Sequence, residues 1–121
     1  MAKVYLDANI IVDIIEERKT VTIKDFEIHD LYASPLSIHI LTYLYKYKMP
    51  NKKLAGFIDE FIFIPFDDVI LYKAVLGPTT DFEDNAQLHS AAEADCDIFL
   101  TNDEKLLKMK FFGKTRINSN L

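Results

Sequence analysis

Three acidic residues in this chain stand where predicted strands end or a predicted helix begins. Asp7 follows the apolar residues 4–6, and Asp103 follows the apolar segment 98–100 after two polar residues. Asp84 is the last of three acids that open a later helical segment. Carboxylate oxygens are preferred ligands of Mg²⁺ and Mn²⁺, and a metal so held can activate water and stabilise charge on a phosphoryl group. The pattern predicts an acidic metal site assembled from distant parts of the chain.

The elements around these acids should bring them together. Residues 4–6 are typical of a short buried strand, and the isoleucines at 10, 11, 14 and 15 recur at helical spacing. This tight strand-to-helix turn puts Asp7 at the carboxyl end of a strand, where open parallel sheets bind their ligands. Right-handed crossovers place the carboxyl ends of parallel strands on one rim. Asp7 and Asp103 are therefore expected on the same rim.

Strand and helix patterns alternate along the chain, which predicts a three-layer α/β/α fold with a mostly parallel central sheet. No repeat or linker interrupts the pattern, so we expect a single domain over residues 1–121. Strands are expected at about 3–6, 31–36, 61–66, 98–101 and 114–117, the last at an edge. Helices are expected at about 9–17, 37–48, 52–60, 68–76, 83–95 and 104–109, with Ser37 and Asp67 as N-caps and a short helix or loop over 18–30.

Composition excludes some classes of function. The formal net charge of −5 argues against a protein that binds nucleic acid by bulk charge alone. It is compatible with an enzyme that contacts nucleic acid through a local basic patch and bound cations. No apolar run approaches the roughly 20 residues that span a membrane, and no signal peptide is recognisable, so we expect a cytoplasmic protein. The single Cys96 excludes an internal disulfide and is expected to be a small buried residue.

Each acid taken singly has a simpler explanation, because Asp is a favoured N-cap and suits the positive end of a helix dipole. The presence of three such acids in one chain favours a shared metal site over three separate caps. Within the acidic segment, Asp84 is expected to face inward, because the small Ala91 and Ala92 lie about two turns further on and allow close packing on the sheet. Asp81 is expected to support the site or cap the helix, and Glu83 to be solvated.

Two polar residues accompany the acids. Asn9 and Thr101 carry an amide and a hydroxyl that can orient ligands or waters by hydrogen bonds. For Thr101 the alternative is an ordinary β-branched strand residue.

In these motifs the chain resembles the PIN domain family, and within it the VapC-like ribonuclease toxins of toxin–antitoxin pairs. The resemblance covers nearly the whole length. It rests on an Asp-x-Asn after the first strand (LDANII, 6–11), an acid opening an alanine-containing helix (FEDNA, 82–86) and a Thr-x-Asp after a later strand (LTND, 100–103).

The resemblance implies a PIN-like α/β/α fold and an endoribonuclease that uses Mg²⁺ or Mn²⁺. Asp7, Asp84 and Asp103 would be the catalytic and metal-binding residues, with Asn9 and Thr101 in support. The implied partners are an RNA substrate, a protein antitoxin and a second copy of the chain in a homodimer.

The chain departs from the family at one acid. The family usually carries a further acid, commonly Glu, in the helix after the second strand, and the matching position is Ile40. No Asp or Glu occurs from 31 to 58. His39 is adjacent, but successive helix positions point about 100° apart, which makes it a poor substitute. The site is therefore either active with fewer ligands, or it is degenerate in a domain that binds protein or RNA.

A locally basic, aromatic stretch lies at 43–53, with three tyrosines and four lysines. Such side chains can hold single-stranded RNA by stacking and phosphate contact, or the tyrosines can pack on a core or a partner.

Two other classes of protein also place an Asp after the first strand. An aspartyl-phosphatase would need a second Asp where Asn9 stands, and a receiver domain would need its phosphorylated Asp after a mid-chain strand.

Overall fold

The computed structural model describes residues 1–19 and 22–121. Its sheet has six strands in the order β3-β2-β1-β4-β6-β5. All neighbouring strands are parallel except β5 and β6, which are antiparallel. The strands are β1 (Lys3–Leu6), β2 (Asp30–Ala33), β3 (Ile62–Phe63), β4 (Ile98–Leu100), β5 (Phe111–Phe112) and β6 (Thr115–Asn118).

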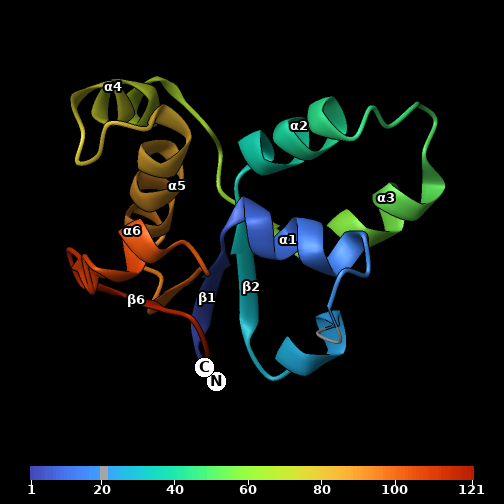
Figure 1. Ribbon diagram of the computed structural model, residues 1–121, viewed down its shortest axis with the longest axis horizontal. Helices are drawn as coiled ribbons and strands as arrows, with labels where there is room; N and C mark the ends of the chain where they lie inside the picture. The colour runs from blue at the N-terminus through green and yellow to red at the C-terminus, as the bar shows by residue number, and fades with distance from the viewer. Residues whose placement is uncertain (20–21) are drawn as a thin grey trace.

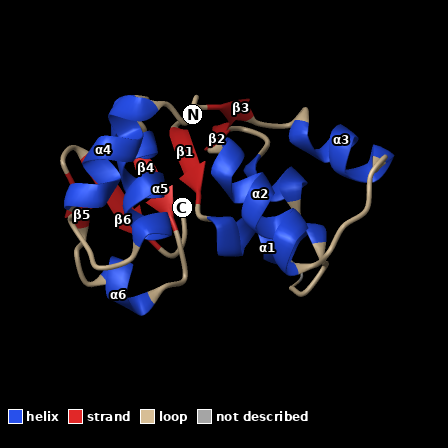
Figure 2. Cartoon of the chain, turned by 90° about the horizontal axis from the view of Figure 1, so that it is seen from above, coloured by secondary structure: helices blue, strands red, loops and turns tan. Residues whose placement is uncertain are grey.

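Helices cover both faces of this sheet (Figures 1 and 2). They are α1 (Ala8–Ile15), α2 (Pro35–Leu44), α3 (Lys52–Ile58), α4 (Asp68–Leu76), α5 (Phe82–Glu93) and α6 (Glu104–Leu107), with a 3₁₀ helix η1 at Ile23–Phe26. The first three helices lie on one side of the sheet and the last three on the other (Figure 2). The predicted α/β/α fold class with a mostly parallel sheet is confirmed. None of the described helices is long and apolar enough to cross a membrane.

β1 is the central strand, and its side chains alternate between two cores. Val4 and Leu6 belong to one cluster of buried side chains, together with residues of α1, α2 and α3. Tyr5 points to the opposite cluster, where its ring stacks on Phe99 of β4 at 5.2 Å between centroids. This alternation is the period of two that a strand buried on both faces requires.

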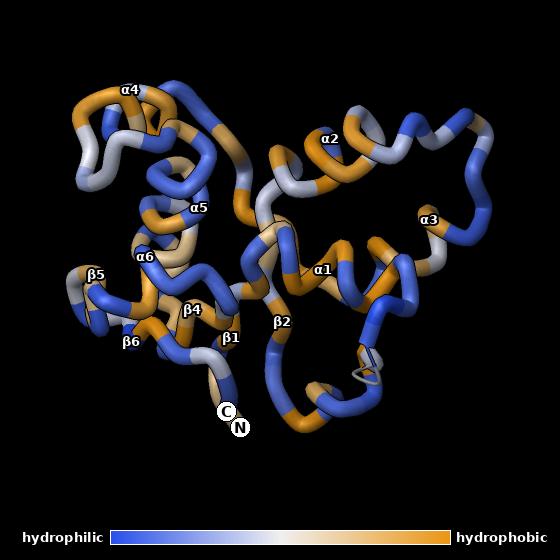
Figure 3. The backbone as a smooth tube through the Cα atoms, viewed as in Figure 1, coloured by the Kyte–Doolittle hydropathy of each residue, from blue (hydrophilic) through white to orange (hydrophobic). Residues whose placement is uncertain are grey.

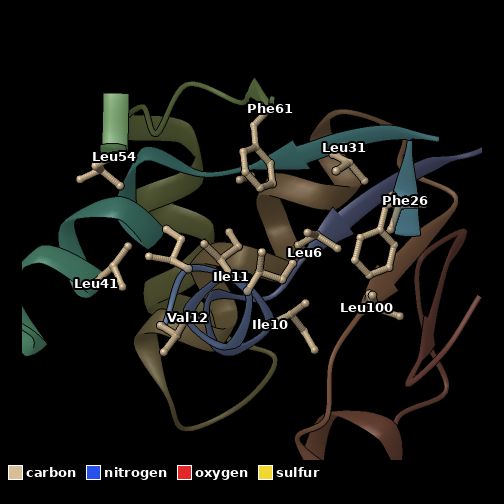
Figure 4. Close-up of a cluster of buried hydrophobic side chains, with 14 residues drawn as sticks. Leu6, Ile10, Ile11, Val12, Phe26, Leu31, Leu41, Leu54, Phe61 and Leu100 are labelled. Carbon is tan, nitrogen blue, oxygen red and sulfur yellow. The ribbon is translucent and has the colours of Figure 1, made fainter. Parts of the chain in front are cut away.

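The first cluster fixes α1 and α2 over the sheet (Figure 4). Ile10, Ile11 and Val12 of α1 are buried there, and so is Leu41 of α2. The predicted helix of isoleucines after β1 is thus confirmed, although it ends at Ile15 and not at residue 17.

The prediction that Ser37 caps the second helix is wrong. Ser34 is the N-cap, and its hydroxyl oxygen accepts a hydrogen bond from the backbone N–H of Leu36 at 3.1 Å. Pro35 follows as the first helical residue, where its missing N–H costs nothing. Ser37 is therefore inside the helix and buried. The prediction for Asp67, which caps α4, is confirmed.

Several predicted boundaries also need correction. The strand expected over 61–66 is limited to Ile62–Phe63, and the helix expected over 37–48 ends at Leu44. The strand expected at the edge near the C-terminus is β6, which lies between β4 and the unpredicted β5. The expected helix or loop over 18–30 contains η1 and the start of β2, and residues 20–21 of it lie outside the described residues.

The helix α4 carries several apolar side chains that are exposed to solvent. The tube of Figure 3 is strongly apolar along this helix, although the helix lies at the periphery. Its exposed apolar residues are Val69, Leu71, Tyr72, Val75 and Leu76.

Leu41 offers a test of the first core. We expect Leu41→Ala to lower the free energy of unfolding by about 2–5 kcal/mol, because the substitution leaves a cavity under a fully buried side chain. The control is Leu44→Ala on the same helix, where the side chain is 61% exposed and the expected change is within about 0.5 kcal/mol. Urea unfolding followed by circular dichroism measures both, and equal effects of the two substitutions would contradict the assigned packing.

Candidate active site

Asp7 lies at the junction of β1 and α1. Its backbone N–H donates to the carbonyl oxygen of Leu100 at 3.0 Å, which extends the pairing of β1 with β4 by one residue. Its own carbonyl oxygen accepts from the N–H groups of Ile10 and Ile11, so α1 begins at once. This sharp turn leaves the side chain at the carboxyl end of the sheet with only 3% of the residue exposed.

Two side chains from distant segments hold the buried carboxylate. The hydroxyl of Thr101 donates to Oδ2 of Asp7 at 2.6 Å, and the amide of Gln87 donates to Oδ1 at 3.0 Å. Burial raises the pKa of Asp7 above its ordinary value, and these two hydrogen bonds oppose that rise because they favour the ionised form. The charge of Asp103 adds to the rise.

The carbonyl oxygen of the Gln87 side chain is held as well. It accepts from the backbone N–H of Ala8 at 2.8 Å, and the hydroxyls of Ser37 and Tyr5 lie at 3.4 and 3.5 Å. Since its oxygen end is occupied by donors, the nitrogen end must face Asp7. One buried amide therefore joins α5 to α1, α2 and β1.

Thr101 links the first acid to the last. Its hydroxyl oxygen accepts from the backbone N–H of Asp103 at 3.0 Å while its proton goes to Asp7. Asp103 is the N-cap of α6, and its Oδ1 accepts from the N–H of Lys105 at 2.8 Å. The other carboxylate oxygen of Asp103 has no hydrogen bond from the described residues.

The third acid stands on α5. Asp81 is the N-cap of this helix and accepts from the backbone N–H of Asp84 at 2.9 Å. The Asp84 side chain is half-buried. Its pKa is raised to about 7, mainly by burial and to a smaller extent by repulsion from the neighbouring carboxylates. Among these neighbours, the charge of Asp81 raises the pKa of Asp84 most, followed by the charges of Asp7 and Asp103.

The three predicted acids therefore form one electrostatic cluster that repels itself. Removing the strain of clustered carboxylates requires a proton or a cation. Within the described residues, however, no three His, Cys, Asp or Glu side chains are placed so that together they could hold a metal ion. The donor chemistry suits a hard cation such as Mg²⁺, which is often bound through only one or two carboxylates and keeps several waters.

The remaining predicted residues fall into two groups. Thr101 contacts the buried acid directly, whereas Asn9 is exposed on the first turn of α1. Ile40, at the position where the family acid was expected, is half-buried, and the adjacent His39 is exposed and packs its ring against Tyr43.

Gln87 and Ser37 were not predicted as members of the site. A signal for Gln87 was present, because it lies one helical turn after Asp84 and a polar residue there faces the same side of α5. Ser37 resembles an N-cap in the sequence, and a capping residue would not be expected to contact Gln87.

Comparison with solved structures supports the fold. A chain of the crystal structure of VapBC2 from Rickettsia felis, bound to a DNA fragment from their promoter, superposes with a TM-score of 0.70. The match covers 96% of this chain and 97% of that chain at 15% sequence identity. The fold is PIN-like. At this identity the PIN-like similarity is one of architecture, and no family model and no curated protein matches the sequence.

The raised pKa of Asp84 makes stability depend on pH. The pKa rises from 3.8 in the unfolded chain to about 7 in the fold, so between these values the folded state holds the extra proton. The free energy of unfolding should therefore fall as pH rises from about 4 to about 7 and then stay low. We expect Asp84→Asn to stabilise the metal-free protein at pH 8 and to have a smaller effect at pH 5.

Thermal unfolding in chelator at the two pH values measures this difference. The control is Glu93→Gln at the far end of the same helix, an exposed carboxylate outside the cluster. A lower melting temperature for Asp84→Asn at pH 8 would contradict the assigned repulsion.

Proposed function

We propose that the protein is a Mg²⁺- or Mn²⁺-dependent endoribonuclease of the toxin type, which hydrolyses RNA phosphodiesters. The observation that carries the proposal is the cluster of three acids, in which Asp7 and Asp103 follow the adjacent parallel strands β1 and β4 and Asp84 lies in the first turn of α5. Parallel α/β sheets bind their ligands at this edge. The PIN-like fold agrees with the resemblance found in the sequence motifs.

Each residue has a distinct part in this proposal. Asp7 is a buried acceptor whose position is set by Thr101 and Gln87, so little reorganisation is needed when a ligand binds. Asp84 and Asp103 are more accessible and offer carboxylate oxygens toward solvent. A bound divalent cation would supply an activated water and charge stabilisation for the phosphoryl group. Asn9 and Asp81 remain predicted as supporting residues.

A second candidate function is a catalytically silent PIN-like domain that binds protein or RNA. Two observations favour it. The first is that Ile40 occupies the position where the family usually carries a further acid. The second is that, among the described residues, no three acids are placed so that together they could hold one metal ion.

The structural similarity to a chain of VapBC2 also suggests partners for this protein. The similar chain is named as part of VapBC2, and we propose that this protein likewise pairs with an antitoxin in the cytoplasm. We further propose that two copies form a homodimer, which light scattering of the purified protein tests directly.

The enzyme proposal is tested by neutralising each acid. We expect Asp7→Asn, Asp84→Asn and Asp103→Asn each to reduce Mn²⁺-dependent cleavage of RNA at least 100-fold, since electrostatic stabilisation of this kind contributes on the order of 10²–10³ per group. Glu93→Gln should cleave as the wild type does. Circular dichroism should show that all four variants fold. Full activity of Asp84→Asn would contradict the assignment of that residue.

Calorimetric titration of Mn²⁺ separates the two candidate functions. Binding by the wild type that is lost in Asp84→Asn supports the enzyme, whereas no binding up to millimolar metal supports the silent domain. The substitution Ile40→Glu adds a second measurement. A large gain in Mn²⁺ affinity would mean that the natural site lacks a carboxylate at that position, and no gain would mean that residue 40 faces elsewhere.

A further inference from the structure

A hollow of about 360 Å³ lies between the exposed side of α2 and the start of α5. It is lined by His39, Ile40, Tyr43, Leu44 and Glu83. Its volume is at the small end of the roughly 300–1,000 Å³ typical of small-molecule sites. The lining combines aromatic and apolar side chains with one carboxylate, which is the composition expected of a site for a flat, partly polar group.

The aromatic side of this hollow is open to solvent. Tyr43 is 74% exposed, and its ring stacks on that of His39 with 6.3 Å between centroids and 24° between planes. The neighbouring tyrosines have partners of their own, since Tyr47 donates to the carboxylate of Glu16 and Tyr45 lies against Arg18. Tyr43 is thus the tyrosine of this segment whose ring is left with an open face.

The hollow and the carboxylate cluster share two helices, α2 and α5. Glu83 directly precedes Asp84, and α2 reaches the cluster through Ser37, whose hydroxyl lies 3.4 Å from Gln87. Ile40 and Tyr43 follow Ser37 at successive turns of α2, so the hollow extends from the cluster along the helix. A ligand whose phosphate is at the acids would extend along α2 toward this hollow.

The segment that follows α2 is rich in lysine. Beyond α2 the exposed residues Lys46, Lys48, Lys52 and Lys53 follow within ten positions of Tyr43, and no acid occurs between 31 and 58. The chain as a whole has a formal net charge of −5, so this segment is more basic than the average of the chain. Cations beside an exposed aromatic ring are the combination that binds single-stranded nucleic acid, by phosphate contact and base stacking.

We propose that this hollow binds one unpaired nucleobase of single-stranded RNA beside the cleavage site. The base stacks on Tyr43 and His39, Ile40 forms an apolar floor, and the Glu83 carboxylate accepts a hydrogen bond from an exocyclic amino group. Cytosine, adenine and guanine carry such a group and uracil does not, so the hollow favours these three bases over uracil. This inference rests on the proposed function, because it specifies how the same site selects its RNA.

The test measures binding without cleavage. Fluorescein-labelled hexamers of rC, rA and rU are titrated with the full chain in chelator, and anisotropy reports the dissociation constants. Tyr43→Ala should weaken binding of the rC hexamer about five-fold or more, as loss of one stacking contact predicts, while Tyr43→Phe keeps the ring and most of the affinity. Tyr72→Ala on α4, which is 68% exposed, is the matched control and should bind as the wild type does.

A second variant tests the polar contact. Glu83→Gln replaces a pure acceptor with an amide that can also donate, so the ratio of the dissociation constants for the rU and rC hexamers should decrease.

Equal binding by the wild type and Tyr43→Ala, or no binding of any hexamer by the wild type, would overturn the inference. If Tyr43→Ala leaves RNA binding intact but changes the mass found by light scattering, the hollow is a protein contact. Metal-dependent cleavage that persists in Tyr43→Ala with unchanged affinity would refute the base site and leave the nuclease proposal standing.

Discussion

Burying the carboxyl group of Asp7 places a strict requirement on the rest of the structure. A buried carboxylate is strongly destabilising unless donors replace the water that it loses. Here the donors are Thr101 from the end of β4 and Gln87 from the middle of α5. To supply them, β4 must lie directly beside β1, and α5 must pack closely on the sheet. The strand order and the position of α5 are therefore tied to one side chain, and the site and the core are stabilised together.

The packing of α5 shows how this is achieved. Ala86, Ser90 and Ala91 are fully buried, and these small side chains let the helix lie close to the sheet. Close approach also brings Asp84 into a half-buried position near other acids, which disfavours its charge. An arrangement that is strained in the absence of a ligand is typical of functional sites, where stability is given up for binding. The silent-domain alternative would have to explain why this strain is kept.

Much of the fold could be predicted from the sequence, because local patterns carried it. The apolar run of β1, the isoleucine spacing of α1 and the Asp67 cap of α4 all act within a few residues. The errors arose where partners are remote or signals compete. Ser34 and Ser37 both resemble N-caps, and Pro35 decides in favour of the first. The strand β5 has only two residues, too few for an alternating pattern, although its partner β6 follows after a short turn. The role of Gln87 depends on contacts about 80 positions away. Such long-range contacts leave no periodic trace in the sequence.

The separation of these partners along the chain has a consequence for synthesis. Asp7 is made well before the hydroxyl that holds it, which comes 94 positions later in the chain. The strand β1 also lacks one of its two neighbours until β4 has been made. Contacts of such high sequence separation form late in folding, because closing the intervening loop is entropically costly. A nascent or truncated chain that stops before β4 therefore contains Asp7 and Asp84 but not the contacts that place them, and any activity of the site begins only after β4, Thr101 and Asp103 have been made.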